Sequence, residues 1–415
     1  MSELKISQSD AKTPDELCAL LRHHHGIRQL AISLEDGVYP ITPTREWADS
    51  NVIDENPGFR FGPEWTLDGR GKATLKVDYS SISDDQLDEI PMSAIISTEL
   101  RFDQTRLNLH TPEEGWWAQP RGQAVRNLAI DLGFRETVDR YRSRGIKFRM
   151  GAVALAGSKA AIEKVHVTNH GSYKYENFPL RIQGAYGMYD RNLIARTDPA
   201  THIFDDGVSD SEASHMTGCL VDGYDESSNN QVSAHFIAGS VGERTPGEWV
   251  HHYRAFSYQT GNRTIGAPGS NMLQAHTCYQ SLRALIEKNF AEGVVAGYYG
   301  DYHKTKAVTI RFNEFGTDAL PCYHGIQIQL SPTAEGMGNA ADYFSHEDYD
   351  LGPNKIVSRA HQVKLDTLGP PTATRFMRGF KVDASLSLDN QGAEVTRTGI
   401  EAQERGGCAW LRLGR

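Results

Sequence analysis

The sequence predicts an all-β protein whose chain winds into a solenoid of similar coils, and two observations lead to this fold class. Short apolar runs of strand length recur between turns that are rich in Gly, Asn, Asp and Ser. In addition, the segments 284–290 and 308–315 both carry an apolar strand that ends at an asparagine, and Asn289 and Asn313 lie 24 residues apart (313 − 289). A period in the twenties is typical of solenoid proteins, in which each coil adds strands to a growing stack.

The first predicted element is a helix that starts at Thr13-Pro14-Asp15-Glu16. Thr13 stands at the N-cap, proline at the first helical position and Glu16 three residues after the cap, which is a capping box. Three leucines at helical spacing then share one face, and we expect the helix to end near 23–26. Adjacent helical residues diverge by about 100°, so the three consecutive histidines there do not converge on one metal ion.

The rest of the chain is predicted mainly as strands, and two segments need a decision. Residues 135–141 fit a second helix, whereas residues 282–288 fit a strand because they belong to the repeated strand-and-asparagine pattern. The other strands alternate in polarity or are β-branched, and they end at turn residues. They are expected at 30–34, 73–77, 125–130, 152–155, 165–167, 308–310 and 326–330.

We interpret the recurrent asparagines as structural residues. Asn and Asp tolerate left-handed backbone angles and hydrogen-bond within their own turns. In stacked coils, such side chains would lie above one another, where their amides can form a ladder. Looser copies of the pattern end at Asn169 and at Asp131.

Composition excludes several classes of protein. With 43 Lys and Arg against 53 Asp and Glu, the 415-residue chain has a net charge of −10 and a pI near 5.9, which argues against a nucleic-acid partner. No run approaches the roughly 20 apolar residues that a membrane-spanning helix needs. The five cysteines are scattered, so neither a disulfide scaffold nor a cysteine zinc site is expected. The N-terminus lacks a signal peptide, so we expect a cytoplasmic protein by default, with export by another route left open.

Several segments of the sequence resemble the pectate-lyase-like right-handed parallel β-helix superfamily. The resemblance covers roughly residues 14–330, and its most specific stretch is LIEKNFAEGVVAGYYGDYHKTKAVTIRFNEF (285–315). The other segments are IRQLAISLEDGVYPI (27–41), LDGRGKATLKV (67–77), AVRNLAIDLGF (124–134) and GAVALAGSKAAIEKVHVTNHG (151–171).

The resemblance implies a single right-handed parallel β-helix with long loops on one side. It implies a capping helix within residues 1–25, a β-helix domain over 26–400 with terminal coils or a flanking strand pair in 355–400, and a tail at 401–415. In such a fold the strands are constrained and the turns can lengthen, so loops over one sheet build the binding cleft. The polar segments expected to be such loops are 42–64, 172–178, 198–212, 222–231, 240–271 and 331–354.

The strongest acidic cluster surrounds Asp205 and Asp206. Neighbouring carboxylates can bind calcium, or can divide into acid and base when their environments differ. Calcium would also ease the binding of an acidic sugar to an acidic protein. Glycan hydrolases of the superfamily use Asp pairs, to which this dipeptide is similar. The alternative is a solvated acidic turn.

The segment Gly300-Asp301-Tyr302-His303-Lys304 offers a second candidate. His303 could act as a general base near neutral pH, with Asp301 orienting the ring or binding a cation. Lys304 or an arginine would stabilise developing charge, and Lys304 is also expected to bind substrate. The alternative is an exposed turn of mixed charge. Elsewhere, the only HxxxH spacing, His166 to His170, falls on a strand and a turn, so a metal role for that pair is not expected.

Loop aromatics are candidates for sugar binding, since aromatic faces stack on the apolar C–H surface of a sugar ring. Trp116, Trp117 and Tyr175 are the residues that we expect to bind substrate in this way. The alternative is that they pack their loops onto the solenoid.

The functional hypothesis is a carbohydrate-active protein that acts on a polysaccharide by lyase, hydrolase or epimerase chemistry, with calcium as the one conceivable cofactor. The superfamily resemblance implies the class. The residues, Asp205, Asp206, Asp301 and His303, follow from chemical type. The competing hypothesis is a non-catalytic β-helix that binds glycan or builds a spike or surface assembly. A third is a cytosolic isomerase-like enzyme that acts on a small sugar.

Overall fold

The computed structural model gives the conformation of most of the solenoid. It describes residues 2–24, 27–43, 58–62, 64–89, 92–98, 122–146, 148–156, 159–170, 172–173, 180–183, 188–195, 219–222, 234–238, 241–243, 248–253, 256–265, 274–279, 283–301, 308–330, 349–367, 376–377, 381–391 and 394–395.

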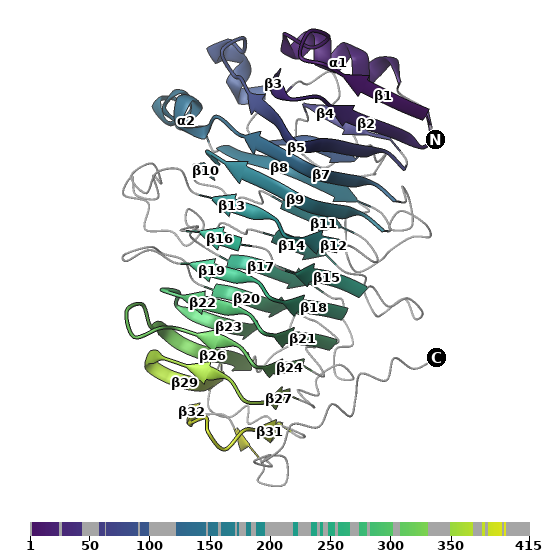
Figure 1. Ribbon diagram of the computed structural model, residues 1–415. Helices are drawn as coiled ribbons and strands as arrows, with labels where there is room; N and C mark the ends of the chain where they lie inside the picture. The colour runs from purple at the N-terminus through teal and green to yellow at the C-terminus, as the bar shows by residue number, and fades with distance from the viewer. Residues whose placement is uncertain are drawn as a thin grey trace, which may run out of the picture.

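The chain folds into a right-handed parallel β-helix, as the sequence predicts (Figure 1). Each coil contributes strands to two large sheets, and each strand pairs in parallel with its counterparts in the neighbouring coils. Parallel strands of one sheet are joined by right-handed crossovers in almost all proteins, and repetition of that crossover generates a right-handed coil. The antiparallel exception among the described strands is β10 (Ser172–Tyr173), which pairs with β8.

The larger sheet, sheet A, consists of two rows of strands. Its first row contains β1 (Ser2–Ile6), β2 (Leu30–Leu34), β5 (Thr66–Val77), β7 (Ala124–Asp131), β9 (Ala161–Thr168), β12 (Met188–Asp190), β15 (Ala234–Ala238), β18 (Phe256–Thr260), β21 (Arg283–Glu287), β24 (Val308–Arg311), β27 (Tyr349–Leu351) and β31 (Lys381–Val382). The second row contains β3 (Gly37–Ile41), the latter halves of β5, β7 and β9, and then β13 (Leu193–Ala195), β16 (Val241–Glu243), β19 (Arg263–Ile265), β22 (Phe290–Glu292), β25 (Glu314–Phe315) and β28 (Lys355–Ile356).

The second sheet, sheet B, stacks one strand from each coil. It contains β4 (Phe59–Phe61), β6 (Met92–Thr98), β8 (Phe148–Ala156), β11 (Leu180–Gln183), β14 (Cys219–Asp222), β17 (Glu248–Tyr253), β20 (Gln274–Tyr279), β23 (Ala296–Asp301), β26 (Cys322–Leu330), β29 (Ser358–Thr367) and β32 (Leu388–Gln391). A separate parallel pair, β30 (Phe376–Met377) and β33 (Glu394–Val395), lies near the C-terminus.

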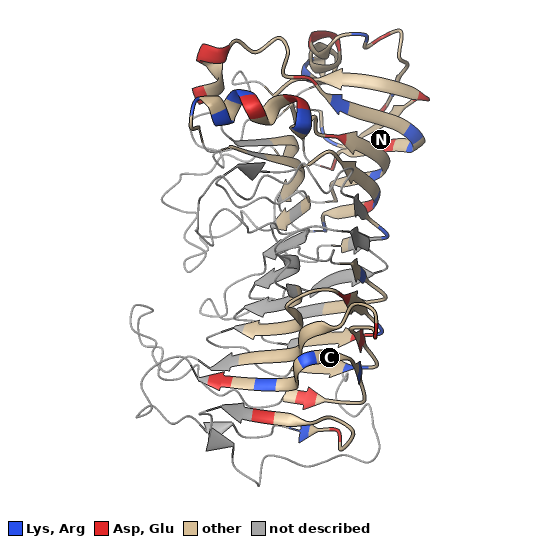
Figure 2. Cartoon of the chain, turned by 90° about the vertical axis from the view of Figure 1, so that its left-hand side faces the viewer, with Lys and Arg blue, Asp and Glu red and all other residues tan. Residues whose placement is uncertain are grey.

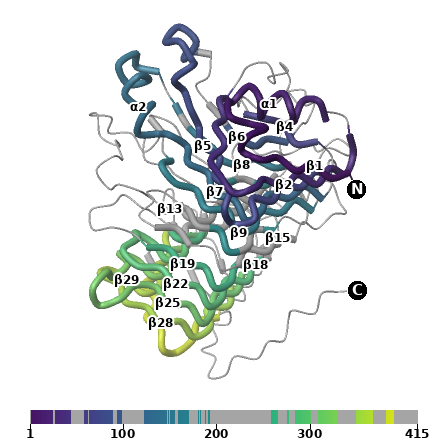
Figure 3. Tube along the Cα trace, turned by 45° about the horizontal axis from the view of Figure 1, so that its top comes forward, coloured from purple at the N-terminus to yellow at the C-terminus, as the bar shows by residue number. Residues whose placement is uncertain are grey.

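The N-terminal end of the solenoid is covered by helix α1 (Pro14–His23), whose predicted capping box is present (Figure 3). Glu16 N–H donates to Thr13 Oγ1, and the Glu16 carboxylate accepts from Thr13 N–H. Leu17 and Leu21 are buried in the core. Strand β1 precedes the helix and pairs with β2, so the first strand of sheet A comes from the first residues of the chain.

Asparagines form the predicted ladder at the turn between the two rows of sheet A. Asn289 Nδ2 donates to Asn313 Oδ1 at 3.0 Å, and Asn313 Nδ2 donates to Asn354 Oδ1 at 2.9 Å. Asn262 extends the ladder, with Nδ2 at 2.9 Å from Asn289 Oδ1. Lys288, with φ of 57°, and Phe312, with φ of 56°, precede two of these asparagines in the left-handed conformation that makes the turn. The looser copies also meet, since Asn169 Nδ2 donates to Asp131 Oδ1 at 3.0 Å.

Three predictions about local structure have different outcomes. The second helix, α2 (Phe134–Ser143), and the strand β21 lie where the sequence places them. The prediction of a long loop over 240–271 is wrong, because β16, β17, β18 and β19 fall within it. Its polar residues are spread over four short strands, and the Gly261-Asn262 turn belongs to the asparagine ladder.

The interior contains two groups of buried apolar side chains, one in the N-terminal coils and one in the C-terminal coils. Ile162 and Val167 belong to the first, and Ile310 and Ile326 to the second; all four are fully buried. The side chains that alternate with them on each strand face outward, and any site on a sheet face is built from these. Within the described residues, no helix has the length and apolarity needed to cross a membrane.

Candidate functional site

Most of the predicted site residues lie outside the described residues. These are Asp205, Asp206, His303, Lys304, Trp116, Trp117 and Tyr175. Asp301 is the exception, because its backbone forms the last residue of β23. The roles assigned to all eight residues therefore stay predictions.

Polar residues occupy one register row at the carboxyl ends of four neighbouring strands of sheet B. Asp222 of β14 pairs with Tyr253 of β17, Tyr253 pairs with Tyr279 of β20, and Tyr279 pairs with Asp301 of β23. Sequence spacing alone does not reveal this row, because the intervals between its members differ. We call these four residues the Asp–Tyr row.

Beyond the Asp–Tyr row, strands β26, β29 and β32 continue sheet B toward the C-terminus, where Figure 2 shows acidic and basic residues on the last strands of the solenoid. Lys364 Nζ and Asp366 Oδ2 are 3.0 Å apart, and Gln327 Nε2 donates to the same Asp366 oxygen at 3.0 Å. These three side chains are largely buried although they lie on the outer face, since they pack against one another. Their inward neighbours in the strands, such as Ile326 and Val363, belong to the core.

Two histidines and an aspartate lie at the other end of the same strands. His361 Nδ1 is 3.0 Å from Asp389 Oδ2, and its ring stacks on that of His324 with centroids 5.2 Å apart. Burial and the positive charges of Lys364 and His361 lower the pKa of His324 to about 4. His324 is therefore neutral at pH 7 and can accept a proton only in acid.

These side chains offer carboxylates, imidazoles, an ammonium group and an amide at the C-terminal end of sheet B. Lys364 and Asp366 face outward, whereas His324 and His361 alternate with them on the strands. Carboxylates and imidazoles transfer protons, and the ammonium and amide groups hydrogen-bond to hydroxyl or carboxylate oxygens. Lys364 is already paired with Asp366, and His361 with Asp389. The two pairs together can bind a polar ligand. The Asp–Tyr row adds two more aspartates, Asp222 and Asp301, to sheet B.

A polar network on the first row of sheet A has a structural role. Glu287 lies between Tyr258 Oη at 2.7 Å and the Arg311 guanidinium, whose Nη2 is 2.9 Å away. Burial raises the pKa of Glu287, but the Tyr258 and Arg311 hydrogen bonds and the Arg311 charge outweigh it, so the pKa falls below its ordinary value. The three side chains link neighbouring coils and leave little surface for a ligand.

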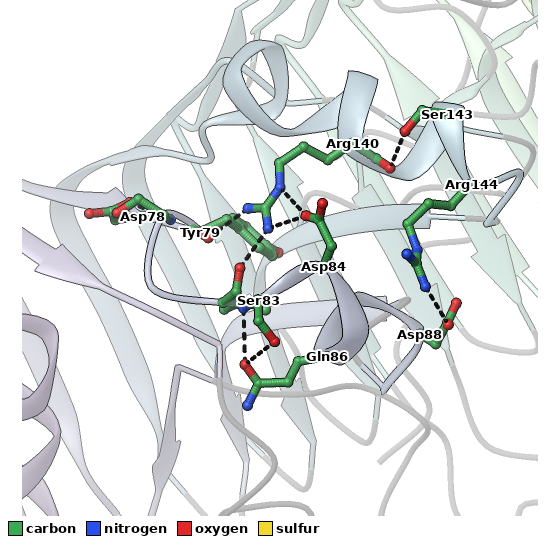
Figure 4. Close-up of polar contacts among 11 residues, drawn as sticks. Asp78, Tyr79, Ser83, Asp84, Gln86, Asp88, Arg140, Ser143 and Arg144 are labelled. Atoms are coloured by element: carbon green, nitrogen blue, oxygen red, sulfur yellow. Dashed lines mark hydrogen bonds and ion pairs between the residues drawn. The ribbon is translucent and has the colours of Figure 1, made fainter.

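The contacts around Arg140 are also structural (Figure 4). The guanidinium donates to Asp84 Oδ1 at 2.7 Å and to the carbonyl oxygens of Tyr79 and Ile82 at 2.9 and 2.6 Å. Arg140 therefore fastens α2 to the 3-10 helix η2 (Asp84–Glu89) and to the turn that leads into it. Because its N–H donors already bind protein acceptors, the Arg140 guanidinium is not a candidate for ligand binding.

The parts of the chain that the structure describes contain no cluster of three or more His, Cys, Asp or Glu side chains suited to a metal ion. His166 and His170 fall on β9 and the turn after it, as predicted. The predicted calcium ligands Asp205 and Asp206 lie outside the described residues, so calcium binding stays a prediction.

Sequence reasoning missed His361, Lys364 and Asp366, although one local signal was present. In the segment HQVKLD (361–366), Lys364 and Asp366 alternate with buried Val363 and Leu365, which is typical of a strand with a charged outer face. Their partners Gln327 and Asp389 lie in other coils. No pattern within one coil indicates that these residues meet.

The chain matches no protein-family profile and no curated protein sequence. Three solved structures share the general fold at low similarity. The A-module of the mannuronan C-5 epimerase AlgE4 of Azotobacter vinelandii is 11% identical, with a TM-score of 0.43 over 94% of this chain and 93% of that one. The endo-xylogalacturonan hydrolase of Aspergillus tubingensis is 9% identical, with a TM-score of 0.41 over 97% and 95%. PfbA, a surface adhesin of Streptococcus pneumoniae, is 9% identical, with a TM-score of 0.37 over 87% and 93%. These proteins differ in activity, so the likeness selects none of them.

Proposed function

We propose that the protein binds a polysaccharide on the outer face of sheet B and acts on it by lyase, hydrolase or epimerase chemistry. The observation that carries the proposal is the Asp–Tyr row, in which Asp222, Tyr253, Tyr279 and Asp301 occupy matching positions on four successive strands. Strands of neighbouring coils lie about 4.8 Å apart, so the row extends over a length suited to a chain-like ligand.

The residue types in the row suit a sugar substrate. Tyrosine rings stack on the C–H faces of sugars, and their hydroxyl groups hydrogen-bond to sugar hydroxyls. Asp222 and Asp301 stand at the two ends of the row, three strand spacings of about 4.8 Å apart. This is farther apart than the two carboxylates of a glycosidase, so each is proposed as an acid or base that acts without the other. Asp301 ends β23 and directly precedes the segment that carries His303 and Lys304, which we propose as base and substrate-binding residue. Asp205 and Asp206 are proposed as calcium ligands, with Trp116, Trp117 and Tyr175 as sugar platforms.

A second candidate is a β-helix that binds glycan without chemistry. One observation favours it, namely that Lys364 is paired with Asp366 and His361 with Asp389. Such pairs form a fixed polar surface to which a glycan can bind, but they leave neither carboxylate without a partner to act as an acid or base. The experiment that follows separates the two candidates.

The test is product formation from a panel of neutral and acidic polysaccharides, with calcium and with a chelator. Reducing ends with ultraviolet absorbance of unsaturated uronates would identify a lyase, and ends without absorbance a hydrolase. Altered proton spectra of uronates without new ends would identify an epimerase. Binding without any of these changes would establish the non-catalytic candidate, and the absence of both binding and products would overturn the proposal.

The matched variants are Asp301→Asn in the row and Asp36→Asn away from it. Asp36 pairs with Lys72 in an exposed ion pair on another side of the coil, so its loss should leave function and stability nearly unchanged. We expect Asp301→Asn to lower turnover at least about 100-fold if this carboxylate transfers a proton. Equal activity in the two variants would remove Asp301 from the mechanism.

A further inference from the structure

Three side chains from three successive strands meet at the C-terminal end of sheet B. The rings of His324 on β26 and His361 on β29 stack with an angle of 16° between their planes. His361 Nδ1 lies 3.0 Å from Asp389 Oδ2 on β32. The pairing of β26 with β29 is irregular at this point, because the register shifts between Cys322 and His324.

His324 occupies a site that does not suit a charged ring. It is 5% exposed, and its Nδ1 has no hydrogen-bond partner among the described residues. On its own strand, the Tyr323 ring contacts it edge-on at 4.7 Å. On the β23 side the residue in register is Ala296, which carries no charge.

The charged groups around His324 come from the two following strands. Lys364 and Asp366 lie on β29 and form an ion pair with each other, and Asp389 on β32 pairs with His361. Asp366 therefore already has a positive partner in Lys364, and Asp389 is already in contact with the His361 ring. A proton added to His324 would place a new positive charge between Lys364 and His361 with no carboxylate of its own.

We propose that His324, His361 and Asp389 form an acid-sensitive latch that holds the last coils closed at neutral pH and releases them in acid. The neutral His324 ring packs against His361 and keeps β26, β29 and β32 together. Protonation of His324 replaces this packing by repulsion, and β29 and β32 separate from β26. Among the described strands of sheet B, β32 pairs on one side only, and the N-terminal coils have a separate core, so β29 and β32 can open while the N-terminal coils stay folded.

The direction of the pH effect follows from the two states of His324. Burial lowers the pKa of His324 to about 4 in the closed form, whereas an exposed ring in the open form has the ordinary value of 6.5. The open form therefore binds protons more readily, and opening increases as the pH falls from 6.5 toward 4. Between pH 7 and pH 4 the opening equilibrium of β29 and β32 should rise about 100-fold.

The test is hydrogen exchange by mass spectrometry on the full chain at pH 7 and pH 4, with correction for the intrinsic exchange rate. We expect β29 and β32 to lose protection in acid before β7 and β9, which belong to the N-terminal coils. Parallel loss of protection in all four strands would overturn the latch.

Two variants should shift this behaviour in opposite directions. His324→Gln removes the titrating group, so β29 and β32 should stay protected at pH 4. Asp389→Asn removes the partner of His361, so opening should begin at higher pH. His276→Gln is the control, because His276 is a buried histidine of sheet B whose pKa is lowered by burial, and its loss should leave the order of opening unchanged.

Acid opening in His324→Gln equal to that of the parent protein would overturn the proposal. If this variant fails to fold, Asp389→Asn decides alone, and an unchanged opening pH in that variant would overturn the proposal. Neither result depends on whether the protein acts on a polysaccharide.

Discussion

Asn289 and Asn313 are joined by two hydrogen bonds, because Asn313 Oδ1 accepts from both the backbone N–H and the side-chain Nδ2 of Asn289, each at 3.0 Å. The side chain of Asn313 in turn donates to the Ile286 carbonyl oxygen at 2.9 Å and to Asn354 Oδ1. Each asparagine therefore satisfies backbone groups of a neighbouring coil as well as the next amide in the ladder. All of these atoms are buried.

Asn313→Ala should lower the free energy of unfolding by about 3 kcal/mol, since it leaves several buried donors and acceptors without partners. Urea unfolding followed by circular dichroism measures the change. Lys72→Ala, on an exposed ion pair, is the control and should change the stability by less than about 1 kcal/mol. A similar small change for Asn313→Ala would show that the ladder contributes little to stability.

Ile310→Asp should prevent folding, because Ile310 is fully buried in the C-terminal core and an aspartate there would be an unpaired buried charge. Ile310→Val is the matched control and should lower the free energy of unfolding by about 1 kcal/mol. Soluble expression and thermal unfolding distinguish the two. A cooperative transition in Ile310→Asp would contradict the placement of Ile310 in the core.

Arg311→Met should destabilise the protein by about 3 kcal/mol, because it leaves the buried Glu287 carboxylate without its cation. The loss should be largest at neutral pH and should shrink in acid, as Glu287 becomes protonated. Adding Glu287→Gln to Arg311→Met should restore much of the stability. A double variant as unstable as Arg311→Met would mean that packing of the arginine stem, rather than charge, accounts for the loss.

The stability of the whole protein should fall in acid through His276. Burial lowers the pKa of this histidine to about 3 in the folded protein, against an ordinary value of 6.5. The unfolded chain therefore binds the proton more tightly, and stability declines as the pH falls from 6.5 toward 3. This residue should account for about 3 kcal/mol of the loss between pH 7 and pH 4.

Urea unfolding at several pH values measures this effect. In His276→Gln, the stability should depend less on pH over the same range. If the free energy of unfolding depended on pH equally in the parent protein and in His276→Gln, the His276 ring would be solvated well enough to titrate normally.

The fold could be predicted because its signals are local. Alternation of polar and apolar residues indicated the strands, and the turn asparagines Asn289 and Asn313 indicated stacking. The site could not be predicted in the same way, because its residues meet across coils of unequal length. Successive ladder asparagines are 24 residues apart between Asn289 and Asn313 but 41 apart between Asn313 and Asn354. Without a constant interval, sequence position does not show that Asp366 faces Gln327.

The asparagine ladder has a consequence for how such a chain can change in length. The segment from Asn289 to Asn313 begins and ends at equivalent points of the turn, because a residue in the left-handed conformation precedes each asparagine. A tandem duplication of that segment would insert one complete coil whose upper and lower surfaces match those already present. The molecule would grow by about 4.8 Å, and the neighbouring strands would find the same partners as before. The stretch between two ladder asparagines can therefore be repeated as a unit, and lengthening the molecule in this way requires no new type of contact.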